Sequence, residues 1–422
     1  MRQIQTFTST YTADVSGVPS ALYELGGMSI MHDASGCNST YNTHDEPRWY
    51  GSKSMVFITG LSEMEAIMGD DQKLVNDIIK AAKELKPRFI AIAGTPIPMI
   101  TGCDIEANAR VIESETGIPT FGINTNGMHS YVEGAGEALY HYAKAFVKKN
   151  VKKKNNSINI LGATPIDFSV NGQIESIKRF LESNGIKVIS NFALGCDIND
   201  MTTAGEASVN LVVSSVGIKV AEYLQNEFDT PYIVGVPYGN QMKQDLLNAI
   251  VGANACRALV GADTIRPIVG TNATVGANAC GALVGASTAS PLFLSDIGNK
   301  FKNEKIYIIG ESVTSKSLAK YIYYKYGHTA KVISAVELGN TYHGDIVKNL
   351  KVRDSVALEK FDLHIEDEDN IAETIKDAKM VIADPLYRPI APDKAIFVNH
   401  PHEGFSGRLY RKNISNLIEI LT

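Results

Sequence analysis

Short apolar runs alternate along this chain with longer stretches of helical period, and this alternation constrains the fold more than any other feature. In the first third, runs such as 28–32 and 89–93 are short and rich in apolar residues. Between them, the stretch 71–85 places Leu74 and Ile78 on one helical face. Strands that alternate with helices pair in parallel sheets covered by those helices. The sequence therefore predicts an α/β fold.

The apolar runs fall into three groups, which predicts three Rossmann-like units with parallel sheets flanked by helices. The expected strands are 28–32, 55–58, 89–93 and 119–123, then 157–161, 187–190, 210–214 and 231–236, then 305–309, 331–336, 361–365, 380–383 and 395–398. A basic polar run at 148–156 has no apolar face and is expected to be a linker. We therefore expect domains over residues 1–150, 151–300 and 301–422.

Length and charge agree with several ordinary domains. The 422 residues suffice for about three domains of roughly 150 residues each. With 40 basic and 46 acidic residues the net charge is −6. The sequence has no stripe of basic residues that could bind the phosphate backbone of a nucleic acid. No apolar run approaches the ~20 residues that cross a bilayer, and the first thirty residues lack signal-peptide features. We expect a cytoplasmic protein that binds neither nucleic acid nor membrane.

A near-perfect tandem repeat interrupts the second predicted unit. Residues 248–264 and 272–288 read NAIVGANACRALVGADT and NATVGANACGALVGAST, with a period of 24 residues. Two copies are fewer than a solenoid needs. The favoured interpretation is a duplication that extends a Gly/Ala-rich packed or looped region. The alternatives are an oligomer contact, or a ligand or redox pair formed by Cys256 and Cys280.

The cysteines point to ligands or buried thiols rather than disulfides. Five cysteines are too few for a disulfide scaffold and odd in number. No close CxxC pair is present, and neither a phosphate-binding loop nor a GxGxxG fingerprint occurs. Any nucleotide dependence is therefore expected on another chain. Cys196 follows a predicted strand and is interpreted as a loop filler.

Two cysteine-containing loops are candidate functional sites. Cys37 lies in a Gly/Ser/Asn loop directly after the strand 28–32, where open α/β sheets present functional groups. Backbone N–H groups in such a loop lower a thiol's pKa and bond cluster sulfides, so position favours function over a buried turn cysteine. Cys103 precedes a predicted helix, whose dipole favours a thiolate. By itself, Cys103 is equally well explained as a residue that only fills space near the start of the helix.

Two further stretches contain clusters of histidine or charged residues. The stretch that follows the last predicted strand contains His400, His402 and Glu403, two His and a Glu in four residues that suit a metal or a substrate that needs protons, and Arg408 follows them. Taken alone, a surface loop with incidental histidines explains it better. The stretch 43–50 gathers charges around the single Trp, and its simplest interpretation is a solvated interface loop.

Taken together, these motifs make the chain similar to the nitrogenase component 1 superfamily. The superfamily includes the nitrogenase catalytic subunits, their cofactor-assembly scaffolds, dark-operative protochlorophyllide reductase and the Ni-sirohydrochlorin a,c-diamide reductive cyclase. The likeness covers nearly the whole chain apart from the duplicated insert. Its most specific parts are the Gly36–Cys37 loop, VFITGLSE at 56–63, IMGDDQKL at 67–74, TGCDIE at 101–106 and ESETGIPTFGIN at 113–124.

The resemblance implies an iron–sulfur cluster between two related subunits. Cys37 lies where one family ligand would lie, whereas the ligand after the next strand is replaced near Thr95 and an earlier Gly-Cys ligand has no counterpart. Ser214 aligns with the cysteine that anchors nitrogenase's large cofactor, so that cofactor is not expected. In a homodimer, two copies each of Cys37 and Cys103 would supply four thiolates to one 4Fe–4S cluster on the two-fold axis.

The resemblance also implies a function. The chain would be the catalytic component of a two-component reductase, with ATP bound only by a separate Fe protein that delivers electrons. It would form a homodimer, or a heterotetramer with a paralogue, and hold a small-molecule substrate between its domains near His400, His402 and Arg408. A tetrapyrrole is the favoured substrate, with sulfur- or nitrogen-containing small molecules as alternatives. The other functions are a metallocluster assembly scaffold without turnover and a cluster-free binding or regulatory protein.

Overall fold

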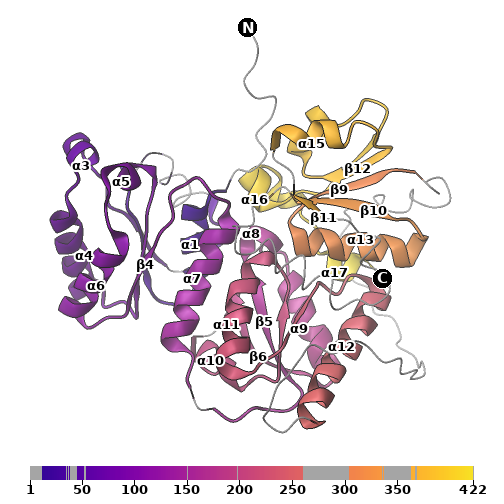
Figure 1. Cartoon of the computed structure of the whole chain (residues 1–422), viewed down its shortest axis with the longest axis horizontal. Coiled ribbons are helices and arrows are strands. Elements are labelled where there is room, and N and C mark those ends of the chain that lie inside the picture. Colours follow the sequence, from indigo (N-terminus) through magenta and orange to yellow (C-terminus); the bar gives the residue numbers. More distant parts are fainter. Residues whose placement is uncertain are drawn as a thin grey trace.

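The computed structural model has three parallel sheets flanked by helices (Figure 1), which confirms the predicted α/β fold. It describes residues 12–34, 36, 38, 45–51, 54–149, 151–196, 198–259, 304–334, 336, 363–365 and 368–421. Among the helices of these residues, none is both long and apolar enough to cross a membrane. Most of the duplicated stretch 248–288 lies outside the described residues.

The first sheet has the strand order β2-β1-β3-β4, with every pairing parallel. Its elements are α1 (Asp14–Leu22), β1 (Met28–Met31), β2 (Met55–Ile58), α3 (Glu63–Met68), α4 (Asp71–Leu85), β3 (Ile90–Ala93), α5 (Pro96–Thr101), α6 (Ile105–Thr116), β4 (Thr120–Ile123) and α7 (Tyr131–Phe146). Local signals set several of these bounds. Ser62 and Glu65 form a capping box at the start of α3, and the carboxylates of Asp70 and Asp104 cap α4 and α6.

The second sheet has the order β6-β5-β7-β8 and is also parallel. Its elements are β5 (Ser157–Ala163), α8 (Pro165–Phe168), α9 (Gln173–Ser183), β6 (Lys187–Ala193), α10 (Ile198–Thr202), η2 (Ala204–Glu206), β7 (Val209–Val212), η3 (Ser215–Gly217), α11 (Ile218–Phe228), β8 (Tyr232–Val234) and α12 (Gly239–Leu259). Thr164 caps α8, and Pro165 occupies its first turn, where no N–H donor is needed.

The third sheet has the order β11-β10-β9-β12-β13, again parallel. Its elements are β9 (Ile306–Gly310), α13 (Ser312–Tyr326), β10 (Ala330–Ser334), β11 (Leu363–Ile365), α15 (Glu368–Thr374), β12 (Met380–Ala383), η7 (Pro385–Ile390), β13 (Ile396–Asn399), α16 (Glu403–Ser406), η8 (Gly407–Asn413) and α17 (Leu417–Ile420). The segment α17 leaves this sheet and packs on α9 of the second.

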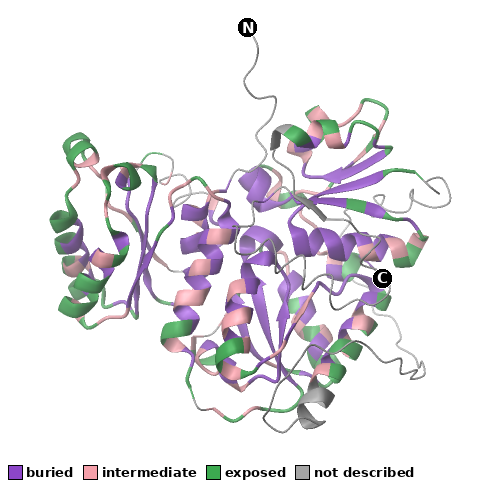
Figure 2. Ribbon diagram, in the orientation of Figure 1, coloured by how far each residue is buried: buried purple, intermediate pink, exposed green. Residues whose placement is uncertain are grey.

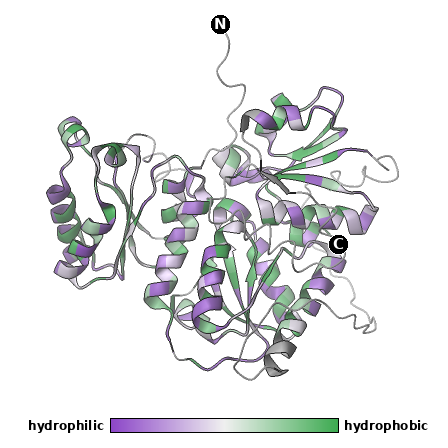
Figure 3. Cartoon of the chain, viewed as in Figure 1, coloured by the Kyte–Doolittle hydropathy of each residue, from purple (hydrophilic) through white to green (hydrophobic). Residues whose placement is uncertain are grey.

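Buried side chains join the three sheets. One core cluster runs from the α1–α7 face of the first sheet into the other two, and another joins the second and third sheets. A third cluster lies under α4 and α6 alone. The strands are mostly buried whereas α3 and α4 are largely exposed (Figure 2), and apolar residues concentrate in the strands (Figure 3).

Two helices of the first unit pack backbone to backbone. A Cβ atom at Gly134 of α7 would overlap the carbonyl oxygen of Asp14, and one at Gly17 of α1 would overlap that of Tyr131. Both positions therefore require glycine. On another side, α7 packs against α11 of the second unit. The α7 helix thus connects two of the three sheets.

Distant segments also meet at residue 12. The N–H of Thr12 donates to the carbonyl of Gly404 at 3.1 Å, and its own carbonyl accepts from the N–H of Tyr131 at 3.2 Å. An isolated bridge pairs Ala13 with Ser130. Thr12 is therefore held between the first turn of α7 and α16.

Candidate functional site

A cavity of about 630 Å³ opens where the three units meet. Its walls come from α1, from the segments after β1 and β3, from residues 45–47, from the start of α8 and from α16. In Figure 1, α1, α8 and α16 gather near the centre of the molecule. The volume lies within the range of small-molecule sites, and the carboxyl ends of strands are where parallel sheets present functional groups. This cavity is the candidate site.

The segment after β1 places a carboxylate on the cavity wall. The side chain of Asp33 accepts hydrogen bonds from the Thr95 hydroxyl at 3.1 Å and from the Asn38 amide at 2.6 Å. Both donors are neutral. Gly36 and Asn38 line the cavity, whereas Cys37 between them lies outside the described residues.

Two other wall carboxylates pair with arginines. Glu46 accepts from Arg48 Nε at 2.6 Å, and Arg48 also contacts Glu24 at 3.0 Å. Glu403 accepts from Arg411 Nε at 2.6 Å. Glu46 and Arg48 are buried, so the interpretation of 43–50 as a solvated loop is wrong at these two residues, whereas Tyr50 is exposed.

A buried polar cluster joins the three units beside the cavity. The Tyr131 hydroxyl donates to Asp167 Oδ1 at 2.5 Å, and the Thr164 hydroxyl donates to Asp167 Oδ2 at 2.7 Å. His402 Nε2 lies 3.6 Å from Asp167 Oδ1, while its Nδ1 accepts from the N–H of Gly404 at 3.0 Å. That backbone donor assigns the proton of the neutral ring to Nε2, facing the carboxylate. Burial and the charge of Asp167 raise the pKa of Tyr131 well above its usual value.

His400 and His402 lie just after β13, and neither of them nor Arg408 is among the residues that line the cavity. The N–H of His400 donates to the carbonyl of Ala383 at 2.7 Å. Burial lowers the pKa of His400 to about 4, with a smaller contribution from His402, so this ring is neutral at pH 7. Arg408 is exposed, and its Nε lies 3.8 Å from a carboxylate oxygen of Asp45 on the wall.

Cys103 lies in the turn between α5 and α6, half-buried against the α4–α6 side of the first sheet. The Asn108 amide donates to its sulfur at 3.4 Å. Burial, followed by the neighbouring carboxylate of Asp71, raises the pKa of Cys103 to about 12. The thiol is therefore protonated at neutral pH, unlike the thiolate expected from its position before a helix. Desolvation and a like charge outweigh the helix dipole here.

Among the described residues, Cys196 and Ser214 add no ligand set. Cys196 packs against the main core, in keeping with a loop filler, and Ser214 is buried with its hydroxyl donating to the carbonyl of Gly162 at 2.7 Å. Cys280 and the side chain of Cys256 lie outside the described residues. Within the described part of the chain, no three His, Cys, Asp or Glu side chains are grouped to hold a metal ion.

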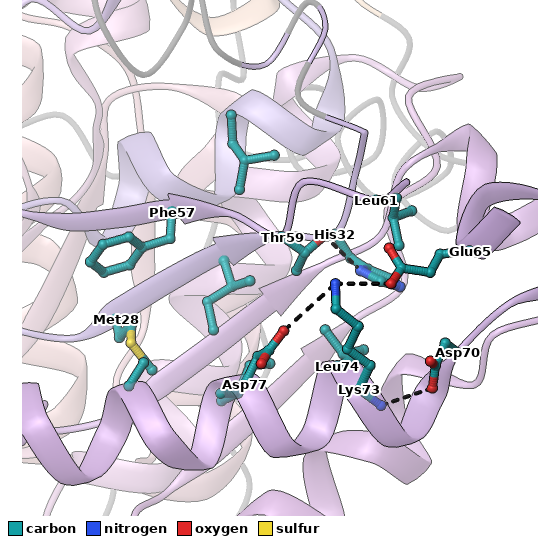
Figure 4. Close-up of a pocket in the computed structure, with 14 residues that line it drawn as sticks. Met28, His32, Phe57, Thr59, Leu61, Glu65, Asp70, Lys73, Leu74 and Asp77 are labelled. Carbon is teal, nitrogen blue, oxygen red and sulfur yellow. Dashed lines mark hydrogen bonds and ion pairs between the residues drawn. The ribbon is translucent and has the colours of Figure 1, made fainter. Parts of the chain in front are cut away.

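A smaller cavity of about 180 Å³ lies between α4 and the β1–β2 edge of the first sheet (Figure 4). Lys73 reaches into it and pairs with Glu65 at 3.0 Å and with Asp77 at 3.8 Å. His32 lines this cavity while the next residue, Asp33, lines the larger one. The carboxyl end of β1 therefore contributes to both.

An exposed apolar surface lies on α3 and α5, which follow β2 and β3 and contact each other. We name it the α3–α5 patch; its members are between 52% and 79% exposed, and they are Met64, Ile67, Met68, Met99 and Ile100. Exposed apolar residues gathered on adjoining helices are typical of surfaces at which proteins interact.

Sequence reasoning missed the buried Asp167 and the wall residue Asp33 as site residues, whereas it grouped Glu403 with His400 and His402. A signal for Asp167 exists, because Thr-Pro-Ile-Asp directly after β5 is a helix-capping sequence at the carboxyl end of a strand. The fold brings this carboxylate to His402 from another sheet, and no local pattern encodes that contact.

Comparison with known proteins places this fold in a family. The family described as nitrogenase component 1 type oxidoreductase matches residues 21–259. One subunit of the light-independent protochlorophyllide reductase of Nostoc punctiforme is 26% identical over 182 residues, which are 40% of this chain and 36% of that protein. The nitrogenase iron-molybdenum cofactor biosynthesis protein NifE of Klebsiella pneumoniae is 24% identical over 227 residues, 50% of this chain and 47% of that protein.

These alignments cover less than half of each relative's own length. A solved structure of nitrogenase Cp1 at pH 6.5 is similar over 100% of this chain and 93% of that one, with a TM-score of 0.64 at 14% identity. At that identity the match shows a shared fold.

Proposed function

Because the chain belongs to the nitrogenase component 1 type oxidoreductases, we propose that it is the catalytic component of a two-component reductase. It receives electrons from a separate ATP-hydrolysing Fe protein and reduces a small molecule, with a tetrapyrrole as the favoured class. The observation that supports this best is a ligand-sized cavity whose wall includes both neighbours of Cys37. Because the proposed reaction uses ATP, the location we propose is the cytoplasm.

We propose Cys37 and Cys103 as ligands of a 4Fe–4S cluster shared between two copies of the chain. Two copies of each residue supply four thiolates, the complement of such a cluster; pairing with a paralogue is the alternative. Ligation requires Cys103 to lose the proton that burial and Asp71 retain in the metal-free protein. When bound, the cluster supplies single electrons at low potential.

Substrate contacts are proposed for His400, His402 and Arg408. Arg408, beside the wall residue Asp45, can meet an acidic group at the cavity mouth, while His402 and Asp167 lie behind α16. Glu403 is a further proton-holding group, because burial raises the pKa of this wall carboxyl despite its pairing with Arg411. A raised pKa brings an acid closer to the pH at which proton transfer is efficient.

The α3–α5 patch is the surface we propose for the Fe protein. Its helices follow β2 and β3, Cys103 comes directly after α5, and Cys37 follows β1, the strand between β2 and β3 in the sheet. These carboxyl ends share one edge of the parallel sheet, so a partner seated on the patch would lie near the proposed cluster. Exposed acidic side chains, Glu63 and Asp70, flank the patch and suit a partner with a basic rim.

The test is anaerobic purification with iron and sulfide analysis, an EPR spectrum of the reduced state, and an assay of ATP-dependent electron consumption with an added Fe protein. Cys37→Ala is expected to lose the cluster and the electron consumption, while Cys196→Ala, at a cysteine packed on the core, keeps both. Cys103→Ala separately tests the second ligand. Unchanged iron in Cys37→Ala would contradict the ligand assignment.

A metallocluster assembly scaffold is the second candidate, favoured by the match to a cofactor biosynthesis protein over half of this chain. A scaffold retains a metallocluster after purification and consumes no electrons when Fe protein and ATP are supplied. A third candidate, a cluster-free binding or regulatory protein, gives a colourless, iron-free preparation under anaerobic conditions.

A further inference from the structure

We propose that the cavity between α4 and the edge strand β2 is a docking groove for a basic amphipathic helix of another protein. This smaller cavity has a volume of about 180 Å³, and we name it the α4–β2 groove. None of the described residues that line it belongs to the α3–α5 patch. The groove is therefore a separate surface, and the inference does not rest on the function proposed above.

The floor of the groove is a face of the first sheet that the described helices leave partly open. It is formed mainly by alternate side chains of two neighbouring strands and the residues after them, namely Met28, Ile30 and His32 from β1 and Phe57 and Thr59 from β2. On the opposite face Val56 belongs to the main core and is 7% exposed, whereas Phe57 is 41% exposed. Helices ordinarily cover both faces of a parallel sheet. The open face above β2 is therefore a position that a further helix can fill.

One wall of the groove is a single stripe of α4. Its residues recur at the three- and four-residue spacings with which helices pack side by side, and they are Asp70, Lys73, Leu74, Asp77, Ile78 and Ala81. At 1.5 Å per residue, the stripe from 70 to 81 is about 16 Å long. In Figure 4, α4 runs along the groove from the end near Glu65 and Leu61 to the end near Met28 and Phe57. The wall thus has the length of about three turns of a second helix.

The charges of the groove determine the sign of the partner. Three carboxylates line it, those of Glu65, Asp70 and Asp77, against the single ammonium group of Lys73. Hydrogen bonds from the N–H of Ser62 and from Lys73 lower the pKa of Glu65 to about 2, so this carboxyl is ionised at neutral pH. Lys73 lies 3.0 Å from Glu65 but 3.8 Å from Asp77, whose side chain is 63% exposed. Asp77 can therefore meet a cation of the partner.

The same excess of negative charge argues against a second copy of this chain as the occupant. A two-fold axis through the groove would bring the same surface onto itself and place its carboxylates opposite each other, which is unfavourable. A helix with apolar residues at positions i, i+3, i+4 and i+7, and with lysine or arginine beside them, fits both the apolar floor and the acidic wall.

The test uses two fluorescein-labelled model peptides. One consists of leucine and lysine patterned as an amphipathic helix, and in its twin glutamate replaces every lysine. Each is titrated into the purified full-length protein at constant physiological salt and followed by fluorescence anisotropy. We expect the lysine peptide to bind about ten-fold more tightly than the glutamate peptide.

Two matched pairs of variants locate the binding. Asp77→Lys should weaken binding of the lysine peptide by about ten-fold relative to Glu84→Lys, the same charge change at an exposed residue of α4 outside the groove. Phe57→Asp should weaken it in the same way relative to Leu85→Asp, at a 43% exposed residue of α4. Circular dichroism verifies folding, and Asp77→Lys changes an exposed side chain and keeps the test valid if Phe57→Asp does not fold.

Three peptide results would overturn the inference: binding of neither peptide, equal binding of both, or equal effects of Asp77→Lys and Glu84→Lys. Sedimentation velocity of the variants without peptide tests the other occupant. A smaller species for Phe57→Asp but not for Leu85→Asp would assign the groove to a second copy of the chain and would also overturn the inference.

Discussion

At the scale of single residues, the wall carboxylate Glu403 depends on Arg411. Burial raises the pKa of Glu403, and Arg411 opposes that rise. A carboxyl whose pKa is raised on folding is fully stabilising below its unfolded pKa of about 4.3, and that contribution is lost as pH rises through the folded pKa. Removing Arg411 raises the pKa of Glu403 in the folded protein further, so the loss of stability that this substitution causes should grow with pH.

We therefore expect Arg411→Met to lower the free energy of unfolding by about 3 kcal/mol at pH 7 and by clearly less at pH 4, measured by urea denaturation. Lys305→Met, which breaks an exposed pair with Asp377, should cost less than about 1 kcal/mol. An equal loss for Arg411→Met at both pH values would show that the buried carboxylate is not responsible.

His400 should titrate far below the usual histidine range, because burial lowers its pKa to about 4. A base whose pKa falls on folding destabilises the protein as pH drops below its unfolded value of about 6.5. NMR of protein labelled at histidine Cε1 should give a midpoint near 4 for this ring. His400→Asn should lose less stability between pH 7 and pH 5 than the unaltered protein. A midpoint above 6 would contradict a desolvated, neutral ring.

Single residues were also where sequence reasoning was least informative. The positions of Cys37 and Cys103 after strands follow from the apolar pattern, but the protonated thiol of Cys103 depends on Asp71 from another helix. The burial of Glu46 and Arg48 depends on α1 packing over them. Such long-range contacts set the charge state and exposure, and a local pattern does not contain them.

At the scale of elements, the sequence predicted every strand of the described sheets to within a few residues, because each is a short apolar run between helical stretches. The helix Asp71–Leu85 was predicted to the residue, since Asp70 caps it and Pro87 follows it. The α3–α5 patch was not foreseen, because its helices are too short for a periodic pattern to separate buried from exposed faces.

The contact between α1 and α7 predicts opposite effects for two helical glycines. Alanine at Gly134 would overlap the carbonyl oxygen of Asp14, whereas a Cβ at Gly252 of α12 meets nothing within 4 Å. We expect Gly134→Ala to destabilise by at least about 3 kcal/mol in chemical denaturation. Gly252→Ala should stabilise by about 0.5–1 kcal/mol. Similar values for both variants would mean that the helices separate easily.

The α3–α5 patch predicts a variant that folds but receives no electrons. Ile67→Glu puts a charge at the centre of the proposed contact with the Fe protein, where burying it is costly. Electron consumption should fall at least ten-fold with iron content and circular dichroism unchanged. Val111→Glu, at a 49% exposed residue of α6, is the matched control. Equal losses in the two variants would remove the patch as the docking surface.

At the scale of the whole molecule, stability depends on the cluster of Tyr131, Asp167 and His402, which come from α7, α8 and the start of α16. Tyr131→Phe removes a buried hydrogen bond to a carboxylate and should cost about 2 kcal/mol in urea unfolding. Tyr324→Phe, whose hydroxyl bonds Asp245 at an exposed position, should cost under about 1 kcal/mol. Equal costs would show that the cluster does not hold the units together.

The hydrogen bonds at Thr12 have a consequence for biosynthesis. Thr12 is made before every strand of the three sheets, whereas one of its partners, Gly404, is made only after all of them. The first unit can collapse around its own strands while translation continues, since domains fold as units during synthesis. The wall formed by α16 can close over the cavity only near the end, so a nascent chain stalled before residue 404 would carry an open, unsealed pocket.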